Sequence, residues 1–367
     1  MKRLLYVLGV LLIGCNGRQI SDFPVAAFDL SSAKQMKISD FVDSISLIPL
    51  ETNDSSLIRN VRELNIVGTS FFVKDGNYLL IFDNEGNFIN STHHLQGGGP
   101  QDYYSAVSFT WHPDGGLEIF DAARYRMIKY DSGLRYVSHY NLSKDVLPAS
   151  GCIYISEDYR LFFDKSLLKL YSVRKGEIVA VYKGLDVPHF GYFNKMGFQY
   201  KDGTFYVSTK NDNVLYELLI DGHNLKLSPI YRFDFGEDAN FNLEDLPKGE
   251  TDKYYLNYVK NNKREAFVVD KYVDADRNMC FFTYDGKSYF AYQDESRAFN
   301  QVYYNIPMMR QQFLPASLYM NNAFYYVCEP QYLNYVIDES LMSSKEKDKM
   351  KLIREDDNPI VVCYKLK

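Results

Sequence analysis

The polar side chains of this sequence that could bind a ligand lie in its irregular segments. They are Asp102 and Tyr103 after a glycine-rich string, Arg124, His189, Lys210, Asp212 and Arg310. Carboxylate, guanidinium, ammonium and imidazole groups can fix the orientation of a small molecule, glycan or peptide in an otherwise apolar concavity. A shared role for them requires a fold that brings these distant segments to one place.

Paired carboxylates are the main indication of enzyme chemistry. They occur at Glu237 and Asp238, at Glu244 and Asp245, and at Asp338 and Glu339. A glycosidase needs two carboxyl groups about 5 to 10 Å apart, and most of these acidic pairs are interpreted as solvated surfaces. The sequence has no GxSxG, HExxH, EF-hand or Ser-His-Asp signature. His93 and His94 would point in opposite directions on a strand, so we expect no metal site and no cofactor.

Composition favours an all-β protein. The 32 Tyr and 25 Phe suit pleated, half-buried surfaces. A net charge of −6 provides no basic field for phosphates, so nucleic acid is not an expected partner. Cys152, Cys280, Cys328 and Cys363 lie far apart without CxxC spacing, and we interpret them as buried free thiols.

The first residues resemble a secretory signal. Lys2 and Arg3 precede an apolar run from Leu4 to Ile13, which is too short for a permanent membrane span. Leu12 to Cys15 resembles the lipobox of bacterial lipoproteins, in which the cysteine becomes the acylated first residue. This predicts a signal peptide at 1–14, a lipidated N-terminal segment and spacer at 15–40, and a membrane anchor at Cys15. Asn16 is followed by no acidic run, which favours the periplasmic side of the outer membrane over the cell surface.

An internal repeat is the strongest fold signal. Glycine-containing hairpin turns recur at Gly86, Gly133, Gly176 and Gly222, at intervals of 43 to 47 residues. Each turn has the same place in a block of four short runs rich in β-branched and aromatic residues. A period of this length is typical of a propeller. The blocks cover 61–93, 108–140, 151–182, 196–233, 266–305 and 316–367.

The sixth block lacks its fourth strand. The apolar segment 44–51 precedes the first block and belongs to no block of its own. Pairing of Ile45 to Leu50 with Val361 to Lys365 would complete the sixth sheet and close the ring, which removes an exposed edge. The sequence therefore predicts a single six-bladed β-propeller over 41–367.

Three stretches support this fold by resemblance. ISLIPLETNDSSLI at 45–58, QGGGPQDY at 96–103 and DDNPIVVCYKLK at 356–367 resemble the six-bladed β-propeller lipoproteins of Bacteroidota, relatives of the NHL-type propellers. Gly99, Pro100 and Tyr103 match the usual glycine-rich motif, whereas Gln101 and Asp102 depart from it. The resemblance implies the fold and an envelope location, and it implies no activity.

In a propeller, the connections between blades and those between second and third strands open on one face. Here these are 93–105, 122–124, 141–149, 184–194, 210–212, 236–265, 306–314 and 329–359. Gly97 to Pro100 predict a tight turn. Ser343 and Glu346 predict a capped helix within 340–355, and a second short helix could begin at Thr251. We expect both insertions to pack on this loop face and to narrow access to the channel.

The function expected first is ligand binding or scaffolding in the cell envelope, in uptake or sensing of glycans or peptides. A polysaccharide hydrolase or lyase using loop-face carboxylates is the alternative, and a subunit that docks on an outer-membrane protein partner is a third. Any ligand should bind the face around Asp102, Arg124, His189, Lys210 and Arg310. Replacing Arg124 or Lys210 by alanine should weaken binding and leave the melting temperature nearly unchanged.

Overall fold

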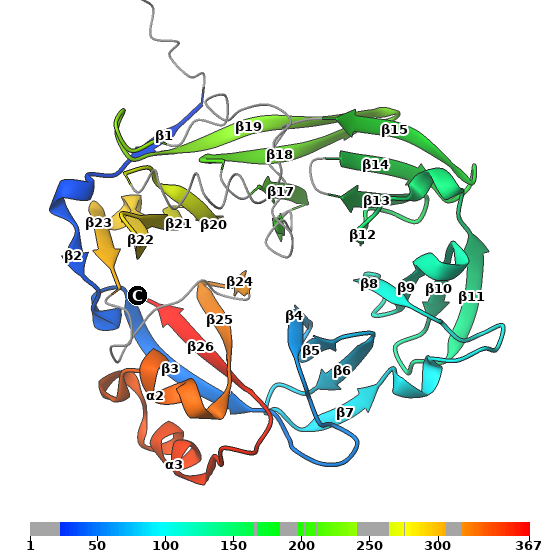
Figure 1. Ribbon diagram of the computed structural model, residues 1–367, viewed down its shortest axis with the longest axis horizontal. Helices are drawn as coiled ribbons and strands as arrows, with labels where there is room; N and C mark the ends of the chain where they lie inside the picture. The colour runs from blue at the N-terminus through cyan, green and yellow to red at the C-terminus, as the bar shows by residue number, and fades with distance from the viewer. Residues whose placement is uncertain are drawn as a thin grey trace, which may run out of the picture.

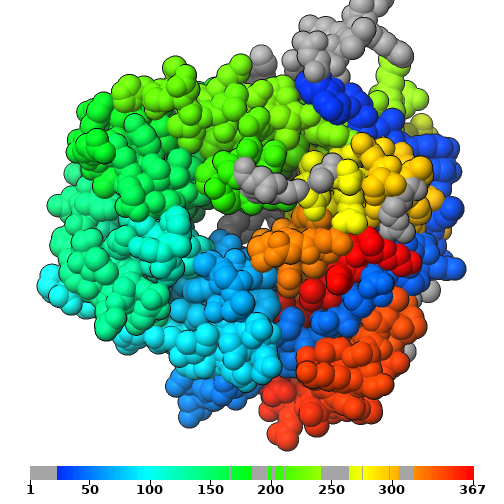
Figure 2. Space-filling view, turned by 180° about the vertical axis from the view of Figure 1, so that it is seen from behind, coloured from blue at the N-terminus to red at the C-terminus, as the bar shows by residue number. Residues whose placement is uncertain are grey.

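The computed structural model describes residues 23–164, 167–183, 197–201, 203–209, 212–240, 264–274, 276–305 and 318–367. The strands in these ranges form six sheets arranged around a central axis (Figure 1). Figure 2 shows a hollow at the centre of the ring, bordered by the first, second, fourth and sixth blades. The prediction of a six-bladed β-propeller is confirmed.

The first three blades follow one another along the chain, each from its inner to its outer strand. Blade 1 contains β4 (Val61–Val67), β5 (Ser70–Asp75), β6 (Tyr78–Phe82) and β7 (Phe88–Ser91). Blade 2 contains β8 (Ala106–Trp111), β9 (Leu117–Asp121), β10 (Arg126–Tyr130) and β11 (Tyr136–Asn141). Blade 3 contains β12 (Gly151–Tyr154), β13 (Tyr159–Asp164), β14 (Leu167–Ser172) and β15 (Glu177–Lys183).

The last three blades also use strands from the N-terminal part of the chain. Blade 4 contains β16 (Gly197–Lys201), β17 (Thr204–Ser208), β18 (Val214–Asp221), β19 (Asn224–Asp234) and β1 (Val25–Ala27). Blade 5 contains β20 (Phe267–Asp274), β21 (Arg277–Tyr284), β22 (Lys287–Asp294), β23 (Phe299–Tyr304) and β2 (Lys34–Gln35). Blade 6 contains β24 (Leu318–Met320), β25 (Ala323–Cys328), β26 (Ile360–Leu366) and β3 (Val42–Pro49).

The core lies between the blades. Separate clusters of buried apolar side chains fill all six junctions, from the cluster of blades 1 and 2 to that of blades 6 and 1. A middle strand such as β9 is therefore buried on both faces, whereas the outer strand β11 is largely exposed. This explains why middle strands are continuous apolar runs. Cys152, Cys280 and Cys328 are buried free thiols, as expected, and Cys363 is a partly buried one.

Strands from the two ends of the chain close the ring. β26 pairs antiparallel with β3, with Val361 opposite Ile48 and Tyr364 opposite Ile45. The predicted closure is confirmed. The same region fixes blade 1, because a Cβ atom at Gly86 would lie 2.1 Å from the carbonyl oxygen of Pro49. Gly86 has a φ of +92°, so this hairpin turn requires glycine on both counts.

Residues 25–40 lie along the outside of blades 4 and 5 (Figure 1). β1 pairs in parallel with β19, and β2 pairs in parallel with β23. Phe28 is 3 % exposed and packs against Phe233 and Phe235, a burial that stabilises by about 1.5–3 kcal/mol. These residues belong to the predicted N-terminal segment and spacer at 15–40, and through β1 and β2 they pair with the ring.

The expected capped helix is present, but it lies at the rim. α3 (Ser344–Leu352) begins at Ser343, whose hydroxyl accepts a hydrogen bond from the Glu346 N–H. The Glu346 carboxylate accepts from Leu47 N at 2.6 Å, and Lys349 donates to Leu47 O at 2.8 Å. The side chains of α3 thus satisfy backbone groups on the free edge of β3, which holds the helix at the rim. The expectation that this helix narrows the channel is therefore wrong.

The connection that leads to α3 also contains α2 (Leu333–Val336), close to the outside of blade 6 (Figure 1). The segment after Thr251 and most of the insertion that contains it lie outside the described residues. Within the described part of the chain, no helix is long and apolar enough to cross a membrane.

Candidate binding face

The glycine-rich string forms a tight turn closed by Asp102. The Asp102 carboxylate accepts a hydrogen bond from Gly99 N at 2.8 Å. A Cβ atom at Gly97 would lie 2.4 Å from Asp102 Oδ2, and one at Gly99 would lie 2.8 Å from it. A side chain at either position would therefore displace the carboxylate that holds the turn. We call residues 97–102 the glycine loop.

Blade 2 holds the glycine loop through the carbonyl oxygens of the loop. Arg124 follows β9 in the short helix η4 (Ala122–Arg124) and donates to the carbonyls of Gly97, Gly99 and Asp102 at 3.1–3.4 Å. Arg126 donates to the carbonyls of Pro100 and Asp102, and the Tyr130 hydroxyl donates to that of Gln101. Two guanidinium groups thus satisfy carbonyl oxygens of the loop, and that of Gly99 also accepts a hydrogen bond from Asp102 N at 3.3 Å.

A buried carboxylate holds the residues that follow the glycine loop. Asp121, at the end of β9, is fully buried and accepts hydrogen bonds from Tyr104 N at 3.0 Å and Ser105 N at 3.2 Å. Arg126 Nε lies 3.6 Å from Asp121 Oδ2 and balances its charge. The residues between the glycine loop and β8 are therefore held by blade 2, as the loop itself is.

The structure brings Asp102, Tyr103 and Arg124 together, but it engages each in internal contacts. Tyr103 is fully buried, and its hydroxyl oxygen lies 3.0 Å from the carbonyl of Asn77 and 3.1 Å from that of Thr92, either of which can accept its proton. Burial raises the pKa of Tyr103 far above its usual value. Because Arg124 holds three carbonyls, its truncation should loosen the loop. The expectation of an unchanged melting temperature for Arg124→Ala therefore does not fit this geometry.

The residue that sequence reasoning missed is Tyr104. Its side chain is 62 % exposed, and the guanidinium carbon of Arg124 lies 5.7 Å from the centroid of its ring. Gln96 Nε2 donates to its carbonyl at 3.2 Å. No periodicity distinguishes Tyr103 from Tyr104 in an irregular loop, so only the direction of the backbone decides which ring is exposed.

The other predicted site residues are separated from this cluster or lie outside the described residues. Asp212, between β17 and β18, is buried and accepts hydrogen bonds from Val214 N at 2.9 Å and the Tyr216 hydroxyl at 2.8 Å. His189, Lys210 and Arg310 lie outside the described residues, as does Cys15.

Buried lysines hold two further connections. Lys169 Nζ donates to three successive carbonyls, Asp145 to Leu147, at 2.7–3.1 Å. Lys271 donates to the carbonyl of Thr209 at 2.8 Å and to that of Asp212. Desolvation lowers the pKa of both ammonium groups. Cations from the blades thus fix loop-face connections at three places around the ring.

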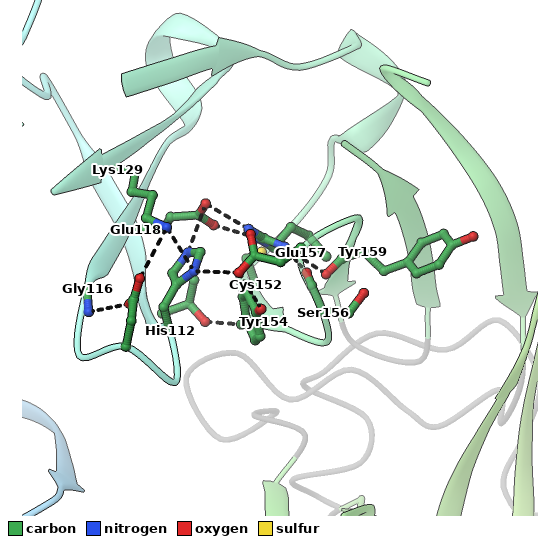
Figure 3. A network of polar contacts seen from close by, with 12 residues as sticks. His112, Gly116, Glu118, Lys129, Cys152, Tyr154, Ser156, Glu157 and Tyr159 are labelled. Carbon is green, nitrogen blue, oxygen red and sulfur yellow. Dashed lines mark hydrogen bonds and ion pairs between the residues drawn. The ribbon is translucent and has the colours of Figure 1, made fainter. Parts of the chain in front are cut away.

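A second polar network joins blades 2 and 3 at the opposite end of the blades (Figure 3). The Glu118 carboxylate, on β9, accepts two hydrogen bonds from Arg160, on β13, and lies 3.0 Å from His112 Nε2. Burial would raise the pKa of Glu118, but the hydrogen bonds from Arg160 and His112 outweigh it, so the pKa is lowered.

The edge of this network reaches solvent. His112 Nδ1 lies 3.3 Å from Lys129 Nζ and 4.0 Å from the exposed carboxylate of Glu157. The Tyr154 hydroxyl donates to Glu157 at 3.0 Å, and the Tyr154 ring lies 4.6 Å from the Arg160 guanidinium carbon. His112, Glu118 and Arg160 are themselves at most 3 % exposed, so the network is suited to joining blades.

The structure describes two of the three acidic pairs that the sequence offers for catalysis. Glu237 and Asp238 are exposed, and Asp338 caps a short helix by accepting from Ser340 N. Glu244 and Asp245 lie outside the described residues. Within the described ranges, no three His, Cys, Asp or Glu side chains are grouped so that they could hold a metal ion.

Solved structures share this fold. An exported protein of Bacteroides fragilis matches with a TM-score of 0.67 at 16% sequence identity, covering 94% of this chain and 99% of that one. A member of the DUF4221 family from Bacteroides vulgatus matches with a TM-score of 0.49 at 10% identity, covering 89% and 98%. The first likeness shows a common fold. No curated protein sequence matches the chain. The family described as Domain of unknown function (DUF4934) matches residues 22–365, and the chain belongs to it.

Proposed function

We propose that this chain is an exported lipoprotein of the cell envelope, anchored through Cys15, whose propeller binds a ligand or partner on the loop face without transforming it. The predicted signal and lipobox support the export and the anchor. The NHL-like character and the outer-membrane location belong to the same proposal.

The observation that carries the proposal is the fixed glycine loop. Arg124, Arg126 and Tyr130 hold its carbonyls, and Asp121 holds the residues that follow it. A loop already held in one conformation loses little conformational entropy on binding, so its exposed groups form a preorganised surface. Loops on a rigid frame are the usual location of binding residues.

The same contacts weigh against the hydrolase or lyase alternative. An acid and a base for glycoside cleavage must face one cavity with room for substrate between them. Asp102 and Asp212 instead accept hydrogen bonds from backbone N–H groups of their own loops, and Asp121 accepts from Tyr104 N in the neighbouring connection. These carboxylates stabilise loops, which favours binding over catalysis.

The test combines a binding map with a turnover assay on the purified full-length protein. Neutral oligosaccharides, proline-rich peptides and small carboxylic acids are screened by thermal shift. Amide hydrogen exchange then locates each ligand. We expect protection within 95–104, 122–125 and 141–147 and no change in the ligand on prolonged incubation. Protection confined to the opposite face, or conversion of the ligand to product, would overturn the proposal.

A further inference from the structure

Two tyrosines on the loop face of blade 2 have a fixed backbone and an exposed or partly exposed ring. They are Tyr104, in the connection from β7 to β8, and Tyr125, directly after η4. Arg124 lies between them, since its guanidinium contacts the Tyr104 ring and its backbone directly precedes Tyr125. The connections that contain the two rings therefore adjoin on one face.

The backbone of Tyr104 is fixed on both sides. Its N–H is held by Asp121, and its carbonyl accepts from Gln96. The Arg124 guanidinium lies against the ring, and three loop carbonyls hold that guanidinium in turn. The ring is 62 % exposed although its surroundings are ordered.

The backbone of Tyr125 is held in a conformation that its side chain disfavours. Its φ is +52°, in the left-handed region that favours glycine. Leu142 N donates to its carbonyl at 2.7 Å, and Lys144 Nζ lies 5.8 Å from the centroid of its ring. Tyr125 is the left-handed residue at which η4 ends, and these contacts hold it there.

We propose that Tyr104 and Tyr125 are stacking platforms for a neutral glycan strand that crosses the loop face of blade 2. This rests on the proposed ligand binding at that face and names its ligand class. The π face of an aromatic ring carries partial negative charge and attracts the C–H groups on the flat side of a pyranose ring. Two such rings on adjoining connections can contact separate sugar units of one strand.

The groups around the platforms have mixed sign. Lys144 and Asp145 are exposed and adjacent, and Gln96 adds an amide beside Tyr104. Sugar hydroxyls both donate and accept hydrogen bonds, so they can satisfy an ammonium, a carboxylate and an amide together. An acidic or a basic peptide would meet one group of its own sign. These surroundings favour a neutral polyhydroxyl ligand.

The test is calorimetric titration of the full-length protein with maltohexaose, cellohexaose, chitohexaose and mannohexaose, and with a decaproline peptide. Tyr104→Ala removes one platform, and Tyr125→Gly removes the other while suiting its φ. Tyr200→Ala is the matched control, because Tyr200 is 64 % exposed on β16, beside the opposite face. Melting temperatures establish that each variant is folded.

We expect at least one hexasaccharide to bind, with affinity reduced at least about fivefold by Tyr104→Ala and by Tyr125→Gly, and unchanged by Tyr200→Ala. Failure of all four glycans to bind, or tyrosine-dependent binding of decaproline alone, would overturn the glycan assignment. If a hexasaccharide protects the loop face in hydrogen exchange but both folded variants bind it normally, the platforms are wrong and the proposed function stands. Binding of the glycans confined to the opposite face would overturn both the tyrosine platforms and the proposed function.

Discussion

Arg160 pairs with Glu118 across the junction of blades 2 and 3, with Nε 2.6 Å from Oε2 and Nη2 2.8 Å from Oε1. Both side chains are 2 % exposed. Arg160→Met removes the guanidinium and leaves the buried Glu118 carboxylate with His112 beside it, so it should lower the free energy of unfolding by about 3–5 kcal/mol in urea titrations. Arg135→Met is the control, because the exposed Arg135–Asp131 pair should contribute under about 1 kcal/mol. Equal losses would contradict this account.

The lowered pKa of Glu118 predicts how stability depends on pH. Burial opposes ionisation, but Arg160 and His112 outweigh it and depress the pKa in the folded state. A depressed carboxyl pKa contributes stability above the unfolded value of about 4.3, and this is lost as pH falls through the folded value. The difference in unfolding free energy between the unmodified protein and Glu118→Gln should therefore narrow below about pH 4. Urea titrations from neutral to acid pH would measure it, and a constant difference would refute it.

Ring closure predicts coupling between the two ends of the chain. A chain starting at residue 55 lacks β3, so β26 loses the partner of Ile360 to Leu366. Amide hydrogen exchange should become fast in 360–366, because an edge strand opens more easily than a paired one. A chain starting at residue 23 keeps β3 and serves as the control. Unchanged protection in the shorter chain would show that β3 is not needed to hold β26.

The repeat made the fold predictable from the sequence. Runs rich in β-branched and aromatic residues and regular glycine turns identify the blades, and the unassigned segment 44–51 identifies the closing strand. β1 and β2 were missed because strands of three and two residues are too short to form such a run. The cap of α3 is a local signal at Ser343 and was predicted. Its position at the rim depends on the tertiary contacts of Glu346 and Lys349 with Leu47, which no local pattern encodes.

The candidate site was less predictable than the fold. The topology identified the face that Asp102 and Arg124 share, and Gly97 to Pro100 indicated the turn. Which side chains stay available to a ligand depends on which donors satisfy the carbonyl oxygens of the loop. Arg124 and Arg126 donate hydrogen bonds to carbonyls of the glycine loop, and Tyr104 rather than Tyr103 is exposed. The family found is DUF4934, and the NHL-like lipoprotein resemblance stays a prediction.

The glycine loop predicts a graded response to alanine. Gly97→Ala should lower the unfolding free energy by about 1–3 kcal/mol, because its Cβ would overlap the Asp102 carboxylate. Gly98→Ala is the matched control, since nothing lies within 4 Å of a Cβ there, and it should change stability by under about 0.5 kcal/mol. In the double variant Gly97→Ala/Asp102→Ala the losses should be less than additive. Similar losses for Gly97→Ala and Gly98→Ala would argue against the overlap.

The proposed anchor at Cys15 should determine whether the protein fractionates with membranes. Acyl chains contribute about 0.8 kcal/mol per buried methylene, and more than one chain gives stable membrane attachment. The unmodified protein should therefore sediment with membranes, whereas Cys15→Ala should move to the soluble fraction. Cys363→Ala, which changes a cysteine within blade 6, should stay with the membranes. Nine residues lie between Cys15 and Val25 in β1, and the ten Cα–Cα steps reach at most about 35 Å, so the anchor would keep the rim of blade 4 close to the bilayer. Protease treatment of intact cells should leave the protein uncut if it faces the periplasm. Removal of the protein by protease would instead place it on the cell surface, and membrane attachment of Cys15→Ala would contradict the proposed anchor.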